Sequence, residues 1–180
     1  MLLYIGIFSF ALFFLGDYND WKWGNRALKA CFPAGFLLLA AVTVLQTGGN
    51  SGFRPVVRVV CAAAAAVFLG LLLYTLFLAL PAAASYGAPG ECRPAVTRGV
   101  YALCRHPGVL CFIPLYFCLC PAAGLPASAA AVYSALNLLL VVFEDGWVFP
   151  ARLKGYDGYK EETPFLLPTA HSIRACCRAR

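Results

Sequence analysis

Two pairs of ionisable residues stand at the edges of apolar segments. Arg105 and His106 come just before a segment that begins at Gly108, and Glu144 and Asp145 directly follow one that ends at Phe143. A charged side chain costs about 2.5–3.5 kcal/mol at the centre of a bilayer, so these residues should lie at a membrane boundary or line a cavity. If the two pairs face each other, they would bind a zwitterion or form a structural ion-pair lock. If they do not, the basic pair would only anchor a helix at the lipid head groups.

The composition indicates a membrane protein. Hydrophobic residues make up 62% of the 180-residue chain and charged residues 12%, whereas soluble domains carry roughly 25% charged residues. Because no long polar segment is present, residues 1–180 are predicted to form a single membrane domain.

Five apolar segments predict the spans. They run over Leu2–Gly16, Ala30–Leu45, Val59–Leu80, Gly108 to about Pro121, and Leu125–Phe143. Only the third reaches the roughly 20 residues that cross a bilayer unaided, and the first, second and fourth need flanking residues such as Trp21, Trp23 and Lys29. The predicted fold is an all-α polytopic membrane protein with about five transmembrane helices, of which residues 1–80 supply three.

The basic residues predict the orientation. With the amino terminus outside, twelve of the fourteen Lys and Arg residues fall on the inner side, and Arg54 and Arg58 remain outside. The positive-inside rule then predicts a cytosolic carboxyl-terminal tail, and the short loops favour a bacterial inner membrane. Nucleic-acid binding is not expected, because the basic residues form no soluble patch with interleaved aromatics.

This topology brings the two ionisable pairs together. The short loop near Pro121–Gly124 makes the last two spans antiparallel neighbours, so Arg105 and His106 begin one span where Glu144 and Asp145 end the other. The inner loop from Pro81 to Arg105 is expected to start as coil, because it contains Gly87, Pro89, Gly90 and Pro94.

An ordered set of motifs covers Arg93 to Pro168. "GVYALCRHPGVL" (99–110) is followed by Glu144 and then by "GYDGYKEETPFLLP" (155–168). This set resembles the integral-membrane isoprenylcysteine carboxyl methyltransferase family and its bacterial relatives, which include phospholipid N-methyltransferases. The Glu144 to Thr163-Pro164 spacing is similar to the family's spacing, so residues 93–168 are predicted to be the methyltransferase region.

The resemblance implies S-adenosylmethionine as the cofactor, bound at the cytosolic boundary. It also implies that Glu144 holds the cofactor's ammonium, and that Arg105, His106 and Glu144 are the catalytic residues. The implied cofactor-binding residues are Arg93, Val96, Tyr101, His106, Pro107, Gly108, Val109, Glu144 and Tyr156. A facing carboxylate and guanidinium match the ammonium and carboxylate of this cofactor, and each charge-assisted hydrogen bond contributes roughly 1.5–3 kcal/mol.

Methyl transfer is an in-line displacement that needs no metal and no covalent enzyme intermediate, so alignment and exclusion of water are the protein's tasks. A carboxylate acceptor is already ionised at neutral pH. An amine acceptor must lose a proton, and His106, Glu144 and Asp145 are the candidate bases. The expected partners are membrane lipids and a lipophilic or lipidated acceptor.

One position departs from the prenylcysteine branch of the family. That branch has a substrate-contacting basic residue four positions before the glutamate, and here Leu140 occupies the position. Asn137, one helical turn earlier, is the strongly polar side chain in the body of this segment. Asn137 and Asp145 are the predicted substrate contacts, although an amide in a span also forms helix–helix hydrogen bonds.

Other readings lead to different classes of protein. A membrane reductase would bind NADPH, and a non-catalytic scaffold would use Arg105 and Glu144 as a structural lock. A metal site is not expected, because Cys104 and His106 have no second ligand pair at zinc spacing. Cys111, Cys118 and Cys120 are interpreted as packing residues, and residues 169–180 are predicted to be a disordered tail.

Overall fold

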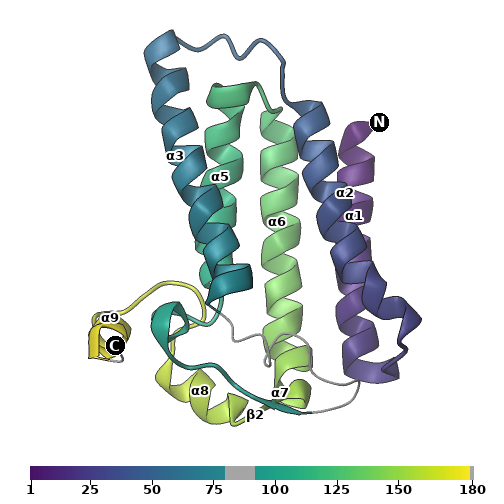
Figure 1. Cartoon of the computed structure of the whole chain (residues 1–180), viewed down its shortest axis with the longest axis vertical. Coiled ribbons are helices and arrows are strands. Elements are labelled where there is room, and N and C mark those ends of the chain that lie inside the picture. The colour runs from purple at the N-terminus through teal and green to yellow at the C-terminus, as the bar shows by residue number, and fades with distance from the viewer. Residues whose placement is uncertain (80–91, 179–180) are drawn as a thin grey trace.

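A computed structural model describes residues 1–79 and 92–178. Five helices form an up-and-down bundle (Figure 1), with the amino terminus at one end and the carboxyl-terminal segments at the other. The five helices are α1 (Leu2–Tyr18), α2 (Cys31–Gln46), α3 (Pro55–Leu73), α5 (Pro107–Ala123) and α6 (Ala127–Phe143).

In the described part of the chain, four helical segments are long and apolar enough to cross a membrane, which confirms the prediction of an all-α membrane protein. They are Leu2–Trp23, Ala27–Gln46, Pro55–Leu78 and Ala127–Arg152. Helix α5 has 17 residues, about 26 Å at 1.5 Å per residue, against about 30 Å for a hydrocarbon core.

Turns of wider helix form the ends of three spans. The π-helical turns η1 (Asn19–Trp23), η3 (Tyr74–Leu78) and η5 (Glu144–Val148) continue α1, α3 and α6. Polar residues in η1 and η5 lowered the local hydropathy and hid this continuation. The first and second segments thus reach spanning length with the flanking residues Trp21, Trp23 and Lys29, as predicted, and the last span continues past its predicted end at Phe143 to Arg152.

Prolines and a glycine define the limits of α5 and α6. Pro107 is the first residue of α5, where its missing N–H costs nothing, and Pro126 precedes α6. Gly124 ends α5 with φ of 72°, a conformation that glycine adopts without strain. Helix α5 also accommodates Pro114 and Pro121 in its interior.

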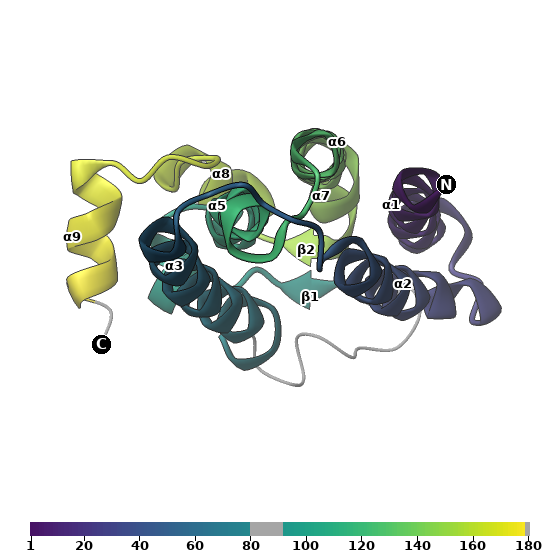
Figure 2. The same cartoon turned by 90° about the horizontal axis from the view of Figure 1, so that it is seen from above.

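The helices pack as two pairs joined by α6. Figure 2 shows α1 beside α2 and α3 beside α5, and α6 contacts both α1 and α5. Aromatic side chains fill the centre, among them Phe10, Phe112, Tyr116 and Tyr133. The outer surfaces are apolar, as a lipid-facing surface must be; in α3, Ala65 is the buried residue.

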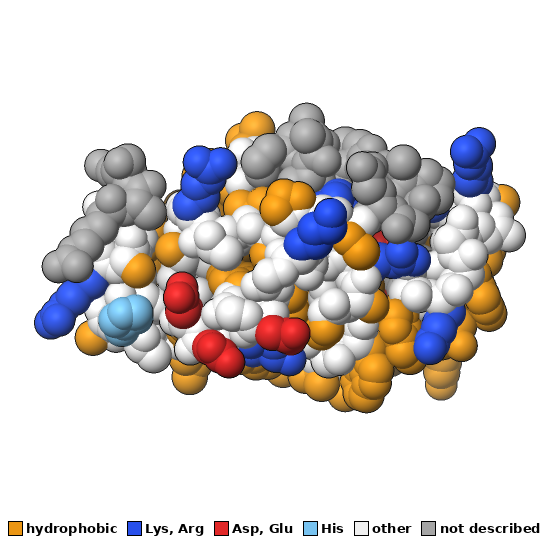
Figure 3. Space-filling view, turned by 90° about the horizontal axis from the view of Figure 1, so that it is seen from below, with side chains coloured by type: hydrophobic (Ala, Val, Ile, Leu, Met, Phe, Trp, Pro, Cys, Tyr) orange, Lys and Arg blue, Asp and Glu red, His pale blue; other side chains and the backbone are white. Residues whose placement is uncertain are grey.

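The two polar stretches meet at one end of the bundle. Strand β1 (Arg93–Pro94) pairs in parallel with β2 (Leu153–Lys154), next to α7 (Phe149–Arg152) and α8 (Tyr156–Glu162). The 3-10 turn η4 (Gly99–Ala102) leads into α5. Lys and Arg side chains are spread over this end (Figure 3). The predicted coil at Gly87, Pro89 and Gly90 lies outside the described residues.

Residues 170–178 form a helix, unlike the disordered tail predicted for residues 169–180, and positions 179–180 lie outside the described residues. Residues Ala170–Arg178 form helix α9, which packs against η4. Its start is capped reciprocally: the Thr169 N–H donates to Ser172 Oγ at 2.9 Å, and the Ser172 N–H donates to Thr169 Oγ1 at 3.2 Å. Capping and packing outweigh the polar composition that suggested disorder.

Candidate functional site at the polar end of the bundle

Arg105 and Asp145 form a bidentate ion pair between the start of α5 and the end of α6. Arg105 Nε donates to Asp145 Oδ1 at 2.7 Å, and Nη2 donates to Oδ2 at 3.1 Å. The side chains are 9% and 11% exposed. The basic pair therefore contacts the acidic pair, as predicted. Arg105 binds Asp145, however, and not Glu144, the partner expected for a structural lock.

Three further side chains surround the Asp145 carboxylate. The Tyr156 hydroxyl donates to Oδ1 at 2.6 Å, Lys160 Nζ lies 3.3 Å from Oδ2, and His106 Nε2 lies 3.3 Å from Oδ1. A carboxylate with this many donors is held in place by the fold. In the described structure Asp145 and Tyr156 thus contact each other and Arg105's end of the site, and their predicted contacts with substrate and cofactor stay predictions.

Arg105 also fixes the segment that follows α8. Its Nη1 donates to the Thr163 carbonyl at 2.7 Å and to the Lys160 carbonyl at 3.1 Å. The backbone N–H groups of Arg105 and His106 donate to the carbonyls of Pro164 and Phe165. Each of the three guanidinium nitrogens therefore donates to the protein, so Arg105 holds the segment after α8 in place, and its predicted catalytic role stays a prediction.

His106 is buried between aromatic rings. Its ring stacks on Phe149 with centroids 5.7 Å apart and meets the edge of Phe165 at 5.0 Å. Burial lowers the pKa of His106 to about 4, even though the Asp145 carboxylate opposes this shift. The imidazole is therefore neutral at physiological pH, and it adds no positive charge to the site.

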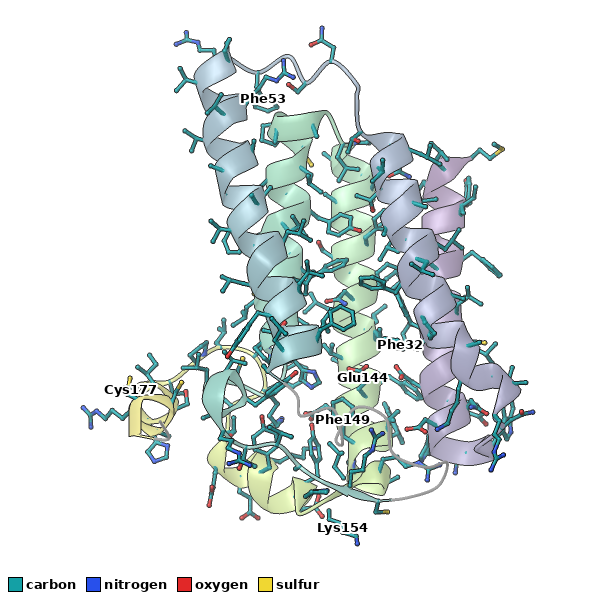
Figure 4. The ribbon with its side chains drawn as sticks, viewed as in Figure 1. Phe32, Phe53, Glu144, Phe149, Lys154 and Cys177 are labelled. Atoms are coloured by element: carbon teal, nitrogen blue, oxygen red, sulfur yellow. The ribbon has the colours of Figure 1, made fainter. Side chains whose placement is uncertain are left out.

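Glu144 lies at the lower end of α6, above the α7–α8 cap (Figure 4), and its side chain is 14% exposed. Its Oε2 lies 3.9 Å from Nδ1 of His106, a contact that is not an ion pair because the imidazole is neutral. The Glu144 carboxyl group is also within hydrogen-bond reach of the Asp17 carboxyl group from α1.

Asp17 has an orphaned oxygen at this site. Its Oδ2 is buried and has no hydrogen-bond donor in the described part of the chain. In residues 1–79 and 92–178, neither Asp17 nor Glu144 forms an ion pair with Lys or Arg. A shared proton or a positively charged ligand would stabilise two carboxyl groups that lie this close together.

Asp17 was not among the predicted site residues. It directly follows the first apolar segment, 127 positions before Glu144. Asp17 could have been found from its position, because it lies at the same predicted membrane boundary as Glu144. The sequence did not predict, however, which helices pack against α1. Only the contact of α1 with η5 shows that the two residues meet.

Tyrosines connect η4 to the rest of the site. The Tyr101 hydroxyl donates to the Thr75 carbonyl at 2.9 Å, and the Tyr159 hydroxyl donates to the Tyr101 carbonyl at 2.6 Å. Burial raises the pKa of Tyr101 to about 12 and also raises that of Tyr159. Tyr101 is thus held beside the start of α5, although its hydroxyl is already bonded.

The other predicted cofactor residues lie at two places. Pro107, Gly108 and Val109 form the first turn of α5, directly after His106, and Val109 is 2% exposed. Arg93 is in β1, and Val96 follows it half-buried.

Asn137 is not part of the group around Glu144. It lies seven residues before Glu144, about 10 Å along α6, in the body of the span. Its Oδ1 is buried and has no hydrogen-bond partner in the described part of the chain, so the alternative helix–helix hydrogen bond is not found there.

No protein-family model, curated protein or solved structure matches this chain. The site must therefore be interpreted from its own geometry.

Proposed function

We propose that this protein is an integral-membrane methyltransferase that uses S-adenosylmethionine and acts on a lipophilic acceptor. The observation that carries the proposal is the pair of carboxyl groups of Asp17 and Glu144, half-buried beside a neutral imidazole and unpaired with any described Lys or Arg. A ligand that brings positive charge would stabilise this pair.

The residues present fit such a cofactor. Glu144 and Asp17 would hold its ammonium group, and the first turn of α5, Pro107 to Val109, would border it. When bound, the cofactor supplies an electrophilic methyl group on a sulfonium. The chain's own residues bind and orient it, and the rings of Phe149 and Phe165 keep water from His106.

The fold serves this function through the ion pair of Arg105 and Asp145. The pair joins α5 to α6 and holds the segment from Lys160 to Thr163 beneath the site. Alignment to within an ångström governs the rate of a displacement, so a rigid support of this kind is needed. We place the site at the cytosolic end of five spans, in the plasma membrane of a bacterium, because basic residues concentrate at this end.

The acceptor is a carboxylate of the isoprenylcysteine type or a lipid amine. A carboxylate is ionised at neutral pH and needs no base. For an amine, His106 is a poor proton acceptor because its pKa is lowered to about 4. Asp145 is committed to Arg105, so the proton would pass to the Asp17 and Glu144 pair.

Calorimetric titration of the purified protein with S-adenosylmethionine tests the proposal. We expect micromolar binding by the wild type and a loss of about tenfold or more in Glu144→Gln and in Asp17→Asn, because one charge-assisted hydrogen bond is worth roughly 1.5–3 kcal/mol. Glu161→Gln is the matched control, since Glu161 is exposed on α8 and should bind normally.

The same titration separates the other classes of function. Binding of NADPH and not of S-adenosylmethionine would indicate a reductase. If the folded wild type binds neither, the ion pair of Arg105 and Asp145 serves a non-catalytic scaffold. Transfer of a labelled methyl group to carboxylate or amine lipids would then identify the acceptor.

A further inference from the structure

Helix α9 lies crosswise to the bundle at the depth where the spans end. In Figure 1 it is seen end-on beside the lower end of α3, and Figure 2 shows its length running across the bundle axis. It packs against η4 through a face that includes buried Ser172 and half-buried Ala175 and Cys176. A helix at this depth and angle lies parallel to a membrane surface.

The faces of α9 that turn away from the protein differ from each other. Ile173, 48% exposed, and exposed Cys177 are four residues apart and form one apolar stripe. Exposed Arg174 lies on the neighbouring stripe, and exposed His171 is two positions before Ile173, on the far side of the helix. This order suits a helix with its apolar edge in lipid and its cation at the head groups.

The neighbouring surface of the bundle faces lipid at the same level. Phe77 and Leu78, in the last turn of the α3 span, are 54% and 75% exposed. Helix α9 therefore lies at the end of an exposed apolar surface of the bundle (Figure 1). The basic residues of this end add attraction for negatively charged lipids.

We propose that α9 is an interfacial helix that binds the anionic head groups of the surrounding bilayer through Arg174, with Ile173 and Cys177 in the lipid. This binding does not depend on the proposed methyl transfer. Since α9 packs against η4, which carries Tyr101, anionic lipid would also steady η4 at the edge of the candidate site.

Hydrogen–deuterium exchange of the full-length protein in nanodiscs tests the head-group contact. Nanodiscs of phosphatidylcholine alone are compared with an equal mixture of phosphatidylcholine and phosphatidylglycerol. A basic residue near an anionic surface should slow exchange in α9 about fivefold, with added protection in η4. Arg174→Gln should lose this gain. Arg58→Gln, which changes a cation at the opposite end of the bundle, should keep it.

Quenching by brominated lipids tests the depth separately. Lipids brominated near the head group should quench the fluorescence of the tryptophan introduced by Ile173→Trp. They should not quench the tryptophan introduced by His171→Trp. Equal exchange in both nanodiscs, or a lipid effect that persists in Arg174→Gln, would overturn the head-group assignment. Equal quenching at the two positions would show that α9 does not lie in the interface.

Discussion

The Arg105 guanidinium and the Asp145 carboxylate meet through two parallel hydrogen bonds, 2.7 and 3.1 Å long, across forty positions of sequence. This contact joins the start of α5 to the end of α6, and in the described part of the chain the neighbouring Glu144 forms no ion pair with Arg. Asp145 thus supports the fold, whereas Glu144 lies outside this ion pair.

Removing one partner of this ion pair should be strongly destabilising. We expect Arg105→Gln to lower the free energy of unfolding by about 3–5 kcal/mol, because it leaves Asp145 buried without its main counter-ion. Thermal unfolding in detergent measures the change. Lys160→Met is the matched control, since the Lys160 side chain is 34% exposed and should contribute less than about 1 kcal/mol. Equal effects of the two substitutions would contradict the assignment.

Stability should depend on pH through His106. Its pKa is lowered in the folded protein from 6.5 to about 4, so the unfolded state binds the proton more readily. The contribution is complete above pH 6.5 and is lost as the pH falls towards 4, by about 3 kcal/mol in total. We expect His106→Gln to show a shallower decline over this range. Parallel curves for wild type and variant would rule out a neutral buried His106.

The close approach of α1 and α2 requires glycine at position 35. A Cβ atom at Gly35 would lie 2.8 Å from the Ser9 backbone carbonyl and 3.1 Å from a Phe13 ring carbon. Gly35→Ala should therefore destabilise the bundle by about 1–3 kcal/mol. Gly70→Ala on α3 is the control: a Cβ there meets nothing within 4 Å, and alanine should be neutral or stabilising in that helix. Unfolding midpoints compare the two.

The hydroxyl of Tyr159 should steady η4. Tyr159→Phe removes the 2.6 Å hydrogen bond to the Tyr101 carbonyl and should cost about 1 kcal/mol. Faster hydrogen–deuterium exchange in residues 99–102, with unchanged exchange in α2, would show the local effect. Unchanged exchange in η4 would mean that other contacts hold this turn.

The sequence predicted the membrane class and the approximate spans, because hydropathy and segment length are local properties. It also predicted that Arg105 and His106 would meet the acidic pair, because a short loop makes consecutive spans antiparallel neighbours. The π-helical turns were missed because polar residues such as Asp20 and Glu144 end an apolar run without ending the helix.

Only the tertiary structure decided which carboxylate Arg105 binds. Glu144 and Asp145 are adjacent in sequence, and the rotation of α6 about its axis directs Asp145 towards Arg105 and Glu144 towards Asp17. Helix rotation follows from packing against all neighbours at once. The same holds for α9, whose place at the membrane boundary depends on its contact with η4, a segment about seventy residues earlier in the chain. Composition and motif spacing do not predict contacts between segments that are this far apart in the sequence.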